Sequence, residues 1–138
     1  MTDTNPDSMW AWLRTAFASG HGDLTSEEFS AYYQPKIDLL IDMNATFIMG
    51  DFRGADKLTF DYLFQLDYPS VAVYHMFDTP RFPTHNRVTV GGFTTDEERD
   101  TAMTIASDLD ICWLRPGRMT SGTARNLIRR LTYLEVKP

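Results

Sequence analysis

The sequence predicts an α/β fold, a three-layer sandwich with a mostly parallel central sheet. Short apolar segments rich in β-branched and aromatic residues alternate with segments of helical periodicity along the chain. Loops that contain glycine lead from three of the predicted strands directly into helix starts. The chain has 138 residues, which is the length of one domain with its own hydrophobic core.

The first two elements are a strand at 13–19 and a helix that begins at Thr25. The strand segment, LRTAFAS, is apolar and is followed by glycine. Thr25 and Glu28 have the spacing of a capping box, in which each side chain accepts a hydrogen bond from a backbone N–H at the helix start. Apolar residues continue at helical spacing to about residue 41, and Pro35 within this pattern predicts a kink or two helical pieces.

The next elements are a buried strand at 45–49, a helix over about 55–66 and a strand at 70–76. The segment ATFIM is almost entirely apolar and ends at Gly50-Asp51. In the helix, Leu58 and Tyr62 lie on one face. The segment SVAVYHM is the clearest strand, because it is apolar and β-branched.

Residues 78–93, with two prolines and two glycines, form a predicted loop. Loops of this length are uncommon in compact domains unless they carry function. Thr95–Glu98 repeats the capping-box pattern and opens a helix to about Ser107. The chain then closes with a strand at 110–114, a helix at 124–131 and a short strand at 133–137.

Residues 1–12 form a polar tail and lead-in, and a single domain occupies 13–138. Trp10 and Trp12 lie at the end of the tail. Three roles are open for them: they lengthen the first strand, cover the sheet edge or contact a second subunit. The last role predicts a homodimer.

The composition argues against several classes of protein. A net charge of −6 disfavours a surface for DNA or RNA, because affinity for phosphate backbones depends on clustered Lys and Arg. Cys112 is the one cysteine, so a reducing compartment fits. No apolar run approaches the roughly 20 residues of a membrane span, and the start, MTDTNPDS, lacks the pattern of a signal peptide. These features predict a cytoplasmic protein that binds neither nucleic acid nor membranes.

Three loops form the candidate binding site. The carboxyl ends of parallel strands meet at one edge of a sheet, where ligands of α/β domains bind. Each of the three loops runs from a predicted strand through glycine to a helix. The loops are Ser19–Gly22, Gly50–Asp56 and Arg115–Thr123.

The last of these loops has the features of a phosphate cradle. Ser121 is expected to cap the helix, and the N–H groups behind it lie at the positive end of the helix dipole, which favours phosphate or carboxylate. A plain helix cap after a flexible turn is the alternative. The predicted ligand residues in this loop are Arg115, Pro116, Gly117, Arg118, Ser121, Gly122 and Thr123.

The other two loops contribute further candidates. Gly54 lets the backbone approach a ligand, and the guanidinium of Arg53 could hold a phosphate. Asp56 either contacts the ligand or complements the dipole of its helix, and His21 could hydrogen-bond a phosphate or a sugar. The predicted ligand residues in these loops are Ser19, Gly20, His21, Gly50, Asp51, Arg53, Gly54 and Asp56.

Other polar residues are expected to have structural roles. His75 is expected to be half-buried and hydrogen-bonded, and His85 to be solvated. Asp108 and Asp110 are interpreted as turn residues. The arginines of the last helix are expected to form a solvated face, at Arg125, Arg129 and Arg130. No spacing of His, Cys, Asp and Glu resembles a metal site, and no cofactor is predicted.

The loop motifs together resemble those of the SLOG superfamily of Rossmann-like domains. This superfamily is related to DNA-processing protein A, the lonely-guy phosphoribohydrolases and the nucleoside 2-deoxyribosyltransferases. Gly50–Asp56 (GDFRGAD) resembles the family's GG-x-RGAD segment, Ser19–His21 its GSR element, and Arg115–Thr123 its PGG-x-GT loop. The resemblance extends over about residues 17–132.

This resemblance implies a pocket for a nucleotide or nucleotide-derived small molecule, with the phosphate or ribose at Gly117–Thr123. In the hydrolase and transferase members, a catalytic Glu lies in the helix after the GT loop. Asn126 stands at that position here. An amide can bind a ribose hydroxyl, but it is neither a nucleophile nor a base at neutral pH. Asn126 therefore favours binding over cleavage.

The alternative is an enzyme, an N-glycosidase or nucleoside deoxyribosyltransferase-like protein that acts on a nucleoside or nucleotide. In that case another carboxylate must replace the missing Glu. The candidates are Asp51, Asp56, Glu97 and Glu98.

Overall fold

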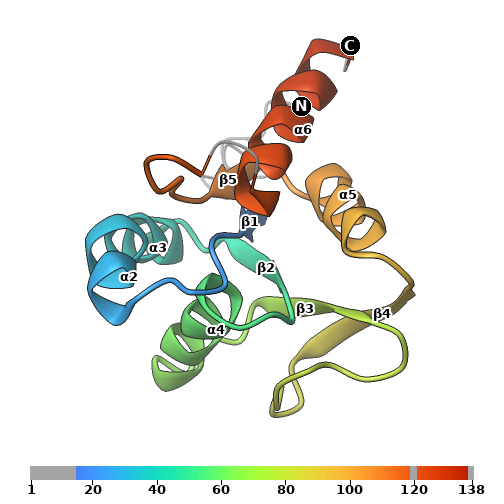
Figure 1. Ribbon diagram of the computed structural model, residues 1–138. Coiled ribbons are helices and arrows are strands. Elements are labelled where there is room, and N and C mark those ends of the chain that lie inside the picture. Colours follow the sequence, from blue (N-terminus) through green and yellow to red (C-terminus); the bar gives the residue numbers. More distant parts are fainter. Residues whose placement is uncertain (1–14, 119–120, 137–138) are drawn as a thin grey trace, which may run out of the picture.

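The computed structural model describes residues 15–118 and 121–136 (Figure 1). Within these residues five strands form one sheet, and helices cover both of its faces. The strands are β1 (Thr15–Ala18), β2 (Thr46–Gly50), β3 (Val71–Met76), β4 (Val88–Phe93) and β5 (Leu109–Ile111). The helices are α2 (Ser26–Tyr32), α3 (Gln34–Asp42), α4 (Ala55–Gln65), α5 (Asp96–Ala106) and α6 (Gly122–Val136).

The sheet has the strand order β4-β3-β2-β1-β5, and every neighbouring pair is parallel. From β1 the chain adds strands on one side of the sheet as far as β4. It then returns through α5 and pairs β5 with the opposite side of β1. The direction of strand addition therefore reverses between β1 and β5, which is the position where open α/β sheets bind ligands at their carboxyl edge.

Two cores, one on each face of the sheet, complete three layers. The larger core joins α2, α3 and α4 to the sheet through Phe29, Tyr33 and Phe60, among others. The smaller core packs Met103 of α5 against Phe17 and Ile48. The arrangement is the Rossmann-like α/β sandwich that the alternation of strands and helices predicts.

The capping box at Thr25 forms as predicted. The N–H of Glu28 donates to Thr25 Oγ1 at 3.1 Å, and the N–H of Thr25 donates to Glu28 Oε1 at 2.9 Å. Pro35 lies in the first turn of α3, where its missing N–H costs no helical hydrogen bond. The pattern at 25–41 therefore folds as two helices, one of the two outcomes expected of Pro35.

The predicted loop at 78–93 is wrong in its second half, because Val88–Phe93 forms the edge strand β4. This strand pairs with β3 and is exposed on both faces, so it lacks the alternation of a half-buried strand. Residues 77–87 cross from β3 to β4 without a helix, and Phe82 in this crossover packs on Phe60 of α4 at 5.3 Å between ring centroids.

The strand predicted at 133–137 is also wrong, because α6 continues to Val136 and Lys137 lies outside the described residues. Once a helix has started, each added residue gains one hydrogen bond, which outweighs the β-propensity of a few residues. The strand predicted at 110–114 is shorter than expected and ends at Ile111.

The predicted tail, residues 1–12 with Trp10 and Trp12, lies outside the described residues. In the part of the chain that the structure describes, no helix is both long enough and apolar enough to span a membrane.

Candidate functional site

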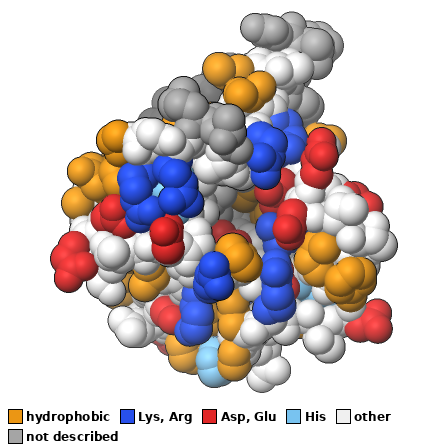
Figure 2. Space-filling view, in the orientation of Figure 1, with side chains coloured by type: hydrophobic (Ala, Val, Ile, Leu, Met, Phe, Trp, Pro, Cys, Tyr) orange, Lys and Arg blue, Asp and Glu red, His pale blue; other side chains and the backbone are white. Residues whose placement is uncertain are grey.

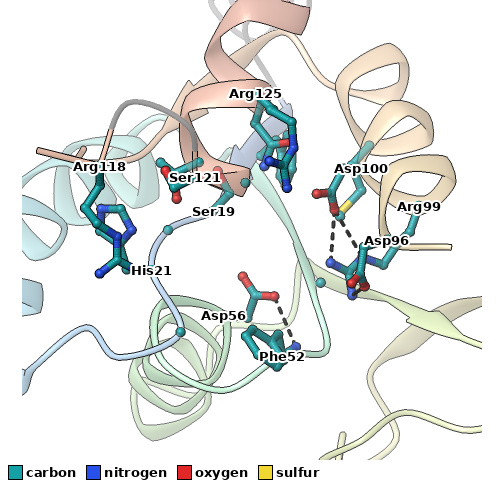
Figure 3. Close-up of a pocket in the computed structure, with 18 residues that line it drawn as sticks. Ser19, His21, Phe52, Asp56, Asp96, Arg99, Asp100, Arg118, Ser121 and Arg125 are labelled. Atoms are coloured by element: carbon teal, nitrogen blue, oxygen red, sulfur yellow. Dashed lines mark hydrogen bonds and ion pairs between the residues drawn. The ribbon is translucent and has the colours of Figure 1, made fainter. Parts of the chain in front are cut away.

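A cavity of about 200 Å³ opens at the carboxyl edge of β1 and β2, between α5 and α6. Figure 2 shows this face of the molecule hollowed between patches of Lys and Arg and of Asp and Glu. Figure 3 shows that the side chains around the cavity come from the loops after β1 and β2, from α5 and from the start of α6. The cavity therefore lies at the point where the direction of strand addition reverses.

The loops after β1 and β2 are packed directly against each other. The N–H of Ala55 donates to the carbonyl oxygen of His21 at 3.1 Å. Gly54 has φ of +74°, and a Cβ there would lie 2.3 Å from that same oxygen. Gly54 is thus required for the contact between the two loops, and it does not line the cavity.

The start of α6 forms one wall of the cavity. Ser121 caps the helix, as predicted, since its Oγ accepts from the N–H of Ala124 at 3.2 Å. Ser19 at the end of β1 lines the same cavity, and its buried Oγ has no hydrogen-bond partner among the described residues. A buried hydroxyl without a hydrogen-bond partner costs free energy. A ligand that hydrogen-bonds to Ser19 Oγ would remove this cost and be stabilised in the cavity.

His21 is held as the neutral imidazole. The N–H of Arg115 donates to His21 Nε2 at 2.8 Å, so Nε2 carries no proton and Nδ1 carries one. Burial lowers the pKa of His21, and the charges of Arg115 and Arg118 lower it further. His21 therefore offers an N–H group without the positive charge of an imidazolium.

Asp56 brings a buried carboxyl group into the cavity from the first turn of α4. Its Oδ2 accepts from the N–H of Phe52 at 3.1 Å. A Cβ at Gly50 would lie 2.6 Å from this oxygen and 2.9 Å from Arg99 Cζ, so glycine leaves room for both side chains. Burial raises the pKa of Asp56 to about 7, even though the charge of Arg99 opposes the rise.

Asp51 has a different environment although it lies only five residues earlier. Its Oδ1 accepts from Arg81 and Arg99, each at 2.9 Å, and its Oδ2 accepts from the N–H of Arg81 at 3.1 Å. Burial alone would raise the pKa of Asp51, but these arginines outweigh burial and lower it. Both carboxylate oxygens of Asp51 therefore accept hydrogen bonds from other residues of the protein, and Asp51 does not line the cavity.

Helix α5 supplies a wall of the cavity that the sequence analysis missed. Asp96, Arg99 and Asp100 all line the cavity (Figure 3). Arg99 donates from Nε and Nη2 to Asp100 Oδ1, at 3.1 Å each. The sequence signal was the spacing of four between the two acids at the start of a helix, which places them on one face.

The structure brings ten of the predicted ligand residues together around the cavity. They are Ser19, Gly20, His21, Gly50, Asp56, Arg118, Ser121, Gly122, Thr123 and Asn126. Of the four candidate catalytic carboxylates, Asp56 lines the cavity, whereas Asp51, Glu97 and Glu98 do not. Glu98 is exposed and accepts instead from Thr94 Oγ1, at 3.2 Å, near the start of α5.

The remaining predicted ligand residues lie away from the cavity. Arg53 is exposed, with its guanidinium 5.1 Å from the centroid of the Phe52 ring. Arg115 pairs with Glu28 at 2.7 Å and Asp23 at 2.9 Å, which joins its loop to α2. Those that do not line the cavity are Asp51, Arg53, Gly54, Arg115, Pro116 and Gly117.

The solvated arginine face expected on the last helix is wrong for Arg130. Arg125 is exposed, as expected, and it also lines the cavity. Arg130 is buried and pairs with Asp110 of β5 at 3.0 Å, so Asp110 is not a turn residue either.

His75 is buried and contacts the carbonyl oxygen of Met76 through Nδ1 at 3.1 Å, whereas His85 is exposed and stacks on Phe64.

Among the residues that the structure describes, no group of three or more His, Cys, Asp or Glu side chains could hold a metal ion.

The fold and the cavity define the chain as a Rossmann-like α/β domain with a polar site at the carboxyl edge of its sheet. The chain matches no protein-family model, no curated protein and no solved structure.

Proposed function

We propose that the cavity binds a nucleotide or nucleotide-derived small molecule, as the resemblance to the SLOG superfamily implies. One observation carries the proposal. The buried hydroxyl of Ser19, which has no hydrogen-bond partner in the part of the chain that the structure describes, lies in the same cavity as the N-terminus of α6, at the position where ligands bind in open α/β sheets.

The groups around the start of α6 suit an anionic part of the ligand. The helix begins at Gly122 and runs for 15 residues, so its N-terminus carries the positive end of a full dipole. Arg118 and Arg125 line the cavity, and the neutral His21 adds a donor at Nδ1. A phosphate bound here would accept hydrogen bonds from these groups and from Ser19.

The test is a thermal-shift screen against nucleosides, mononucleotides, ADP-ribose and cyclic dinucleotides, with mass spectrometry on each mixture. We expect a mononucleotide to raise the melting temperature and to be recovered intact. No shift with any compound in the panel would contradict the proposal.

The variant Gly122→Phe places a ring in the cavity. A Cβ at Gly122 meets only Arg125 Nη2, at 3.7 Å, so the fold has room for a side chain there. We expect this variant to fold and to lose the shift. Thr132→Phe is the matched control, because residue 132 lies on the same helix, is exposed and is not part of the cavity.

One observation favours a second candidate function, cleavage or transfer at an N-glycosidic bond. Asp56 lines the cavity, and its pKa of about 7 is suitable for a general acid or base near neutral pH. In this case free base would appear in the mixtures, and Asp56→Asn would abolish its release. If the ligand stays intact, binding is the function.

A further inference from the structure

We propose that Asp56 and Asp100 form a subsite for the adjacent 2′- and 3′-hydroxyl groups of a ribose, so that the cavity selects ribonucleotides over 2′-deoxyribonucleotides. This inference rests on the proposed function and names the part of the ligand that lies opposite the phosphate.

Both carboxylates are anchored through one oxygen and leave the other for a ligand. Asp56 Oδ2 accepts from the N–H of Phe52, and Asp100 Oδ1 accepts from Arg99. Neither Asp56 Oδ1 nor Asp100 Oδ2 accepts a hydrogen bond from any residue that the structure describes. Figure 3 shows both carboxyl groups at the cavity, each with one oxygen outside the dashed interactions.

These oxygens lie in surroundings where a hydrogen-bond donor is worth most. Asp56 is 7% exposed, and the side chain of Asp100 is 15% exposed. Burial raises the pKa of Asp100 as it does that of Asp56, and the negative charges of Asp100 and Asp51 add to the rise at Asp56. Both side chains are largely buried, and a ligand group that donates a hydrogen bond to the free oxygen of such a carboxyl group stabilises it.

The charges around the carboxylates favour neutral donors over a cation. The guanidinium of Arg99 is bound to Asp100 and its charge also acts on Asp56. Arg118 and Arg125 line the same cavity. An ammonium group would be repelled by these three arginines, and a second phosphate would be repelled by the two carboxylates. Hydroxyl groups carry donors without charge, and a ribose presents two of them side by side.

The second end of the site is independently defined by Ser19. Its buried Oγ has no partner among the described residues and lies beside the N-terminus of α6, across the cavity from the start of α5. The cavity volume of about 200 Å³ is below the roughly 300–1,000 Å³ of sites that enclose a drug-sized molecule. The enclosed part is therefore the sugar phosphate, and the base lies at the opening.

Isothermal titration with AMP, 2′-deoxy-AMP, GMP and CMP tests the inference on the wild-type protein. We expect 2′-deoxy-AMP to bind about tenfold or more weakly than AMP, since it lacks one of the two hydroxyl groups that hydrogen-bond to the carboxyl groups. We expect the three ribonucleotides to differ from one another by less than that factor.

Two variants assign the selectivity to its residues. Asp100→Asn and Asp56→Asn should bring the AMP to 2′-deoxy-AMP affinity ratio towards one, chiefly by weakening AMP. Asp56→Asn keeps a carbonyl oxygen for the N–H of Phe52, so it tests the inference even if Asp100→Asn fails to fold. Asp61→Asn is the control, because it removes an exposed carboxylate from the same helix as Asp56 and should leave the ratio unchanged.

The outcomes separate this inference from the proposed function. Equal affinities of the wild-type protein for AMP and 2′-deoxy-AMP would overturn the ribose subsite and leave nucleotide binding intact. Selectivity that persists in both variants would also overturn it. Absence of binding by every nucleotide would overturn the proposed function and the subsite together.

Discussion

Asp56 shows how burial changes the behaviour of a single residue. An aspartate in the unfolded chain ionises near pH 4, whereas burial raises the pKa of folded Asp56 to about 7. Between these two pH values the folded protein holds a proton that the unfolded chain has lost. The free energy of unfolding contributed by Asp56 therefore decreases as the pH rises from about 4 to about 7, and it is constant above that range.

The variant Asp56→Asn tests this linkage. The amide is never charged, so we expect the variant to gain stability relative to the wild-type protein as the pH rises from 5 to 7, with no further gain at pH 8. Thermal unfolding of both proteins without ligand at each pH measures the difference. Asp61→Asn, the exposed control on the same helix, reports the effect of removing a surface carboxylate. A difference in stability that is the same at pH 5 and pH 8 would contradict the assignment.

Tyr33 is a second residue whose single polar atom has a structural role. Its buried hydroxyl donates to the carbonyl oxygen of Ser19 at 2.7 Å and accepts from the N–H of Trp113 at 3.2 Å. It therefore joins the loop after β1 to the chain that follows β5.

We expect Tyr33→Phe to lower the free energy of unfolding by about 1–3 kcal/mol, because it leaves two backbone groups without their partner. Tyr62→Phe is the matched control, since the Tyr62 hydroxyl bonds the exposed Asp38 and its loss should cost less than about 1 kcal/mol. Urea unfolding measures both values. Equal losses in the two variants would show that Tyr33 does not have this role.

At the scale of elements, Arg130 attaches α6 to the sheet. It donates to Asp110 of β5, to the carbonyl oxygen of Thr104 at 3.1 Å and to that of Ser107 at 3.0 Å. The two carbonyl groups lie at the end of α5, so one side chain joins three elements. The position of the α6 N-terminus at the cavity depends on this attachment.

We expect Arg130→Met to cost about 3–5 kcal/mol, because it leaves the buried Asp110 without its counter-ion. In the double variant with Asp110→Asn, the cost should be smaller than the sum of the two single costs. Lys57→Met, which breaks the exposed pair with Asp61, should change stability by no more than about 1 kcal/mol. Chemical denaturation of the wild-type protein, the two single variants at Arg130 and Asp110 and the double variant gives the double-mutant cycle. Additive losses of stability in the two single variants would contradict a direct interaction between the two side chains.

At the scale of the whole molecule, β4 is an edge strand of the sheet, and among residues 15–118 and 121–136 it pairs with β3 alone. Val88 and Val90 are exposed there, at 63% and 36%. An exposed apolar edge strand is a template for pairing with another chain. We expect the wild-type protein to self-associate at high concentration, and the variant Val88→Lys/Val90→Lys to remain monomeric with an unchanged melting temperature. Sedimentation velocity over a concentration series measures this, and a wild-type protein that stays monomeric throughout would refute it.

Local patterns predicted much of this fold. The alternation of apolar strands with helical periodicity predicted the α/β sandwich, and the hydroxyl groups of Thr25 and Ser121 cap the helices that they were expected to cap. Helix periodicity and capping depend on neighbours within four residues, so they can be recognised in the chain without its partners. The edge strand β4 was not predicted, because it is defined by its pairing with β3, which is not visible in the local sequence. Its side chains also show no alternation of buried and exposed positions.

The three glycine loops were expected to meet at one edge, and they do, because parallel strands end on the same side of a sheet. Which side chains face the cavity could not be predicted from the motifs. Asp51 and Asp56 belong to one segment, yet Asp51 is bound by Arg81 and Arg99, 30 and 48 residues away, while Asp56 faces the cavity. Such contacts depend on strand order and on how α5 packs on the sheet, and no short-range pattern encodes them.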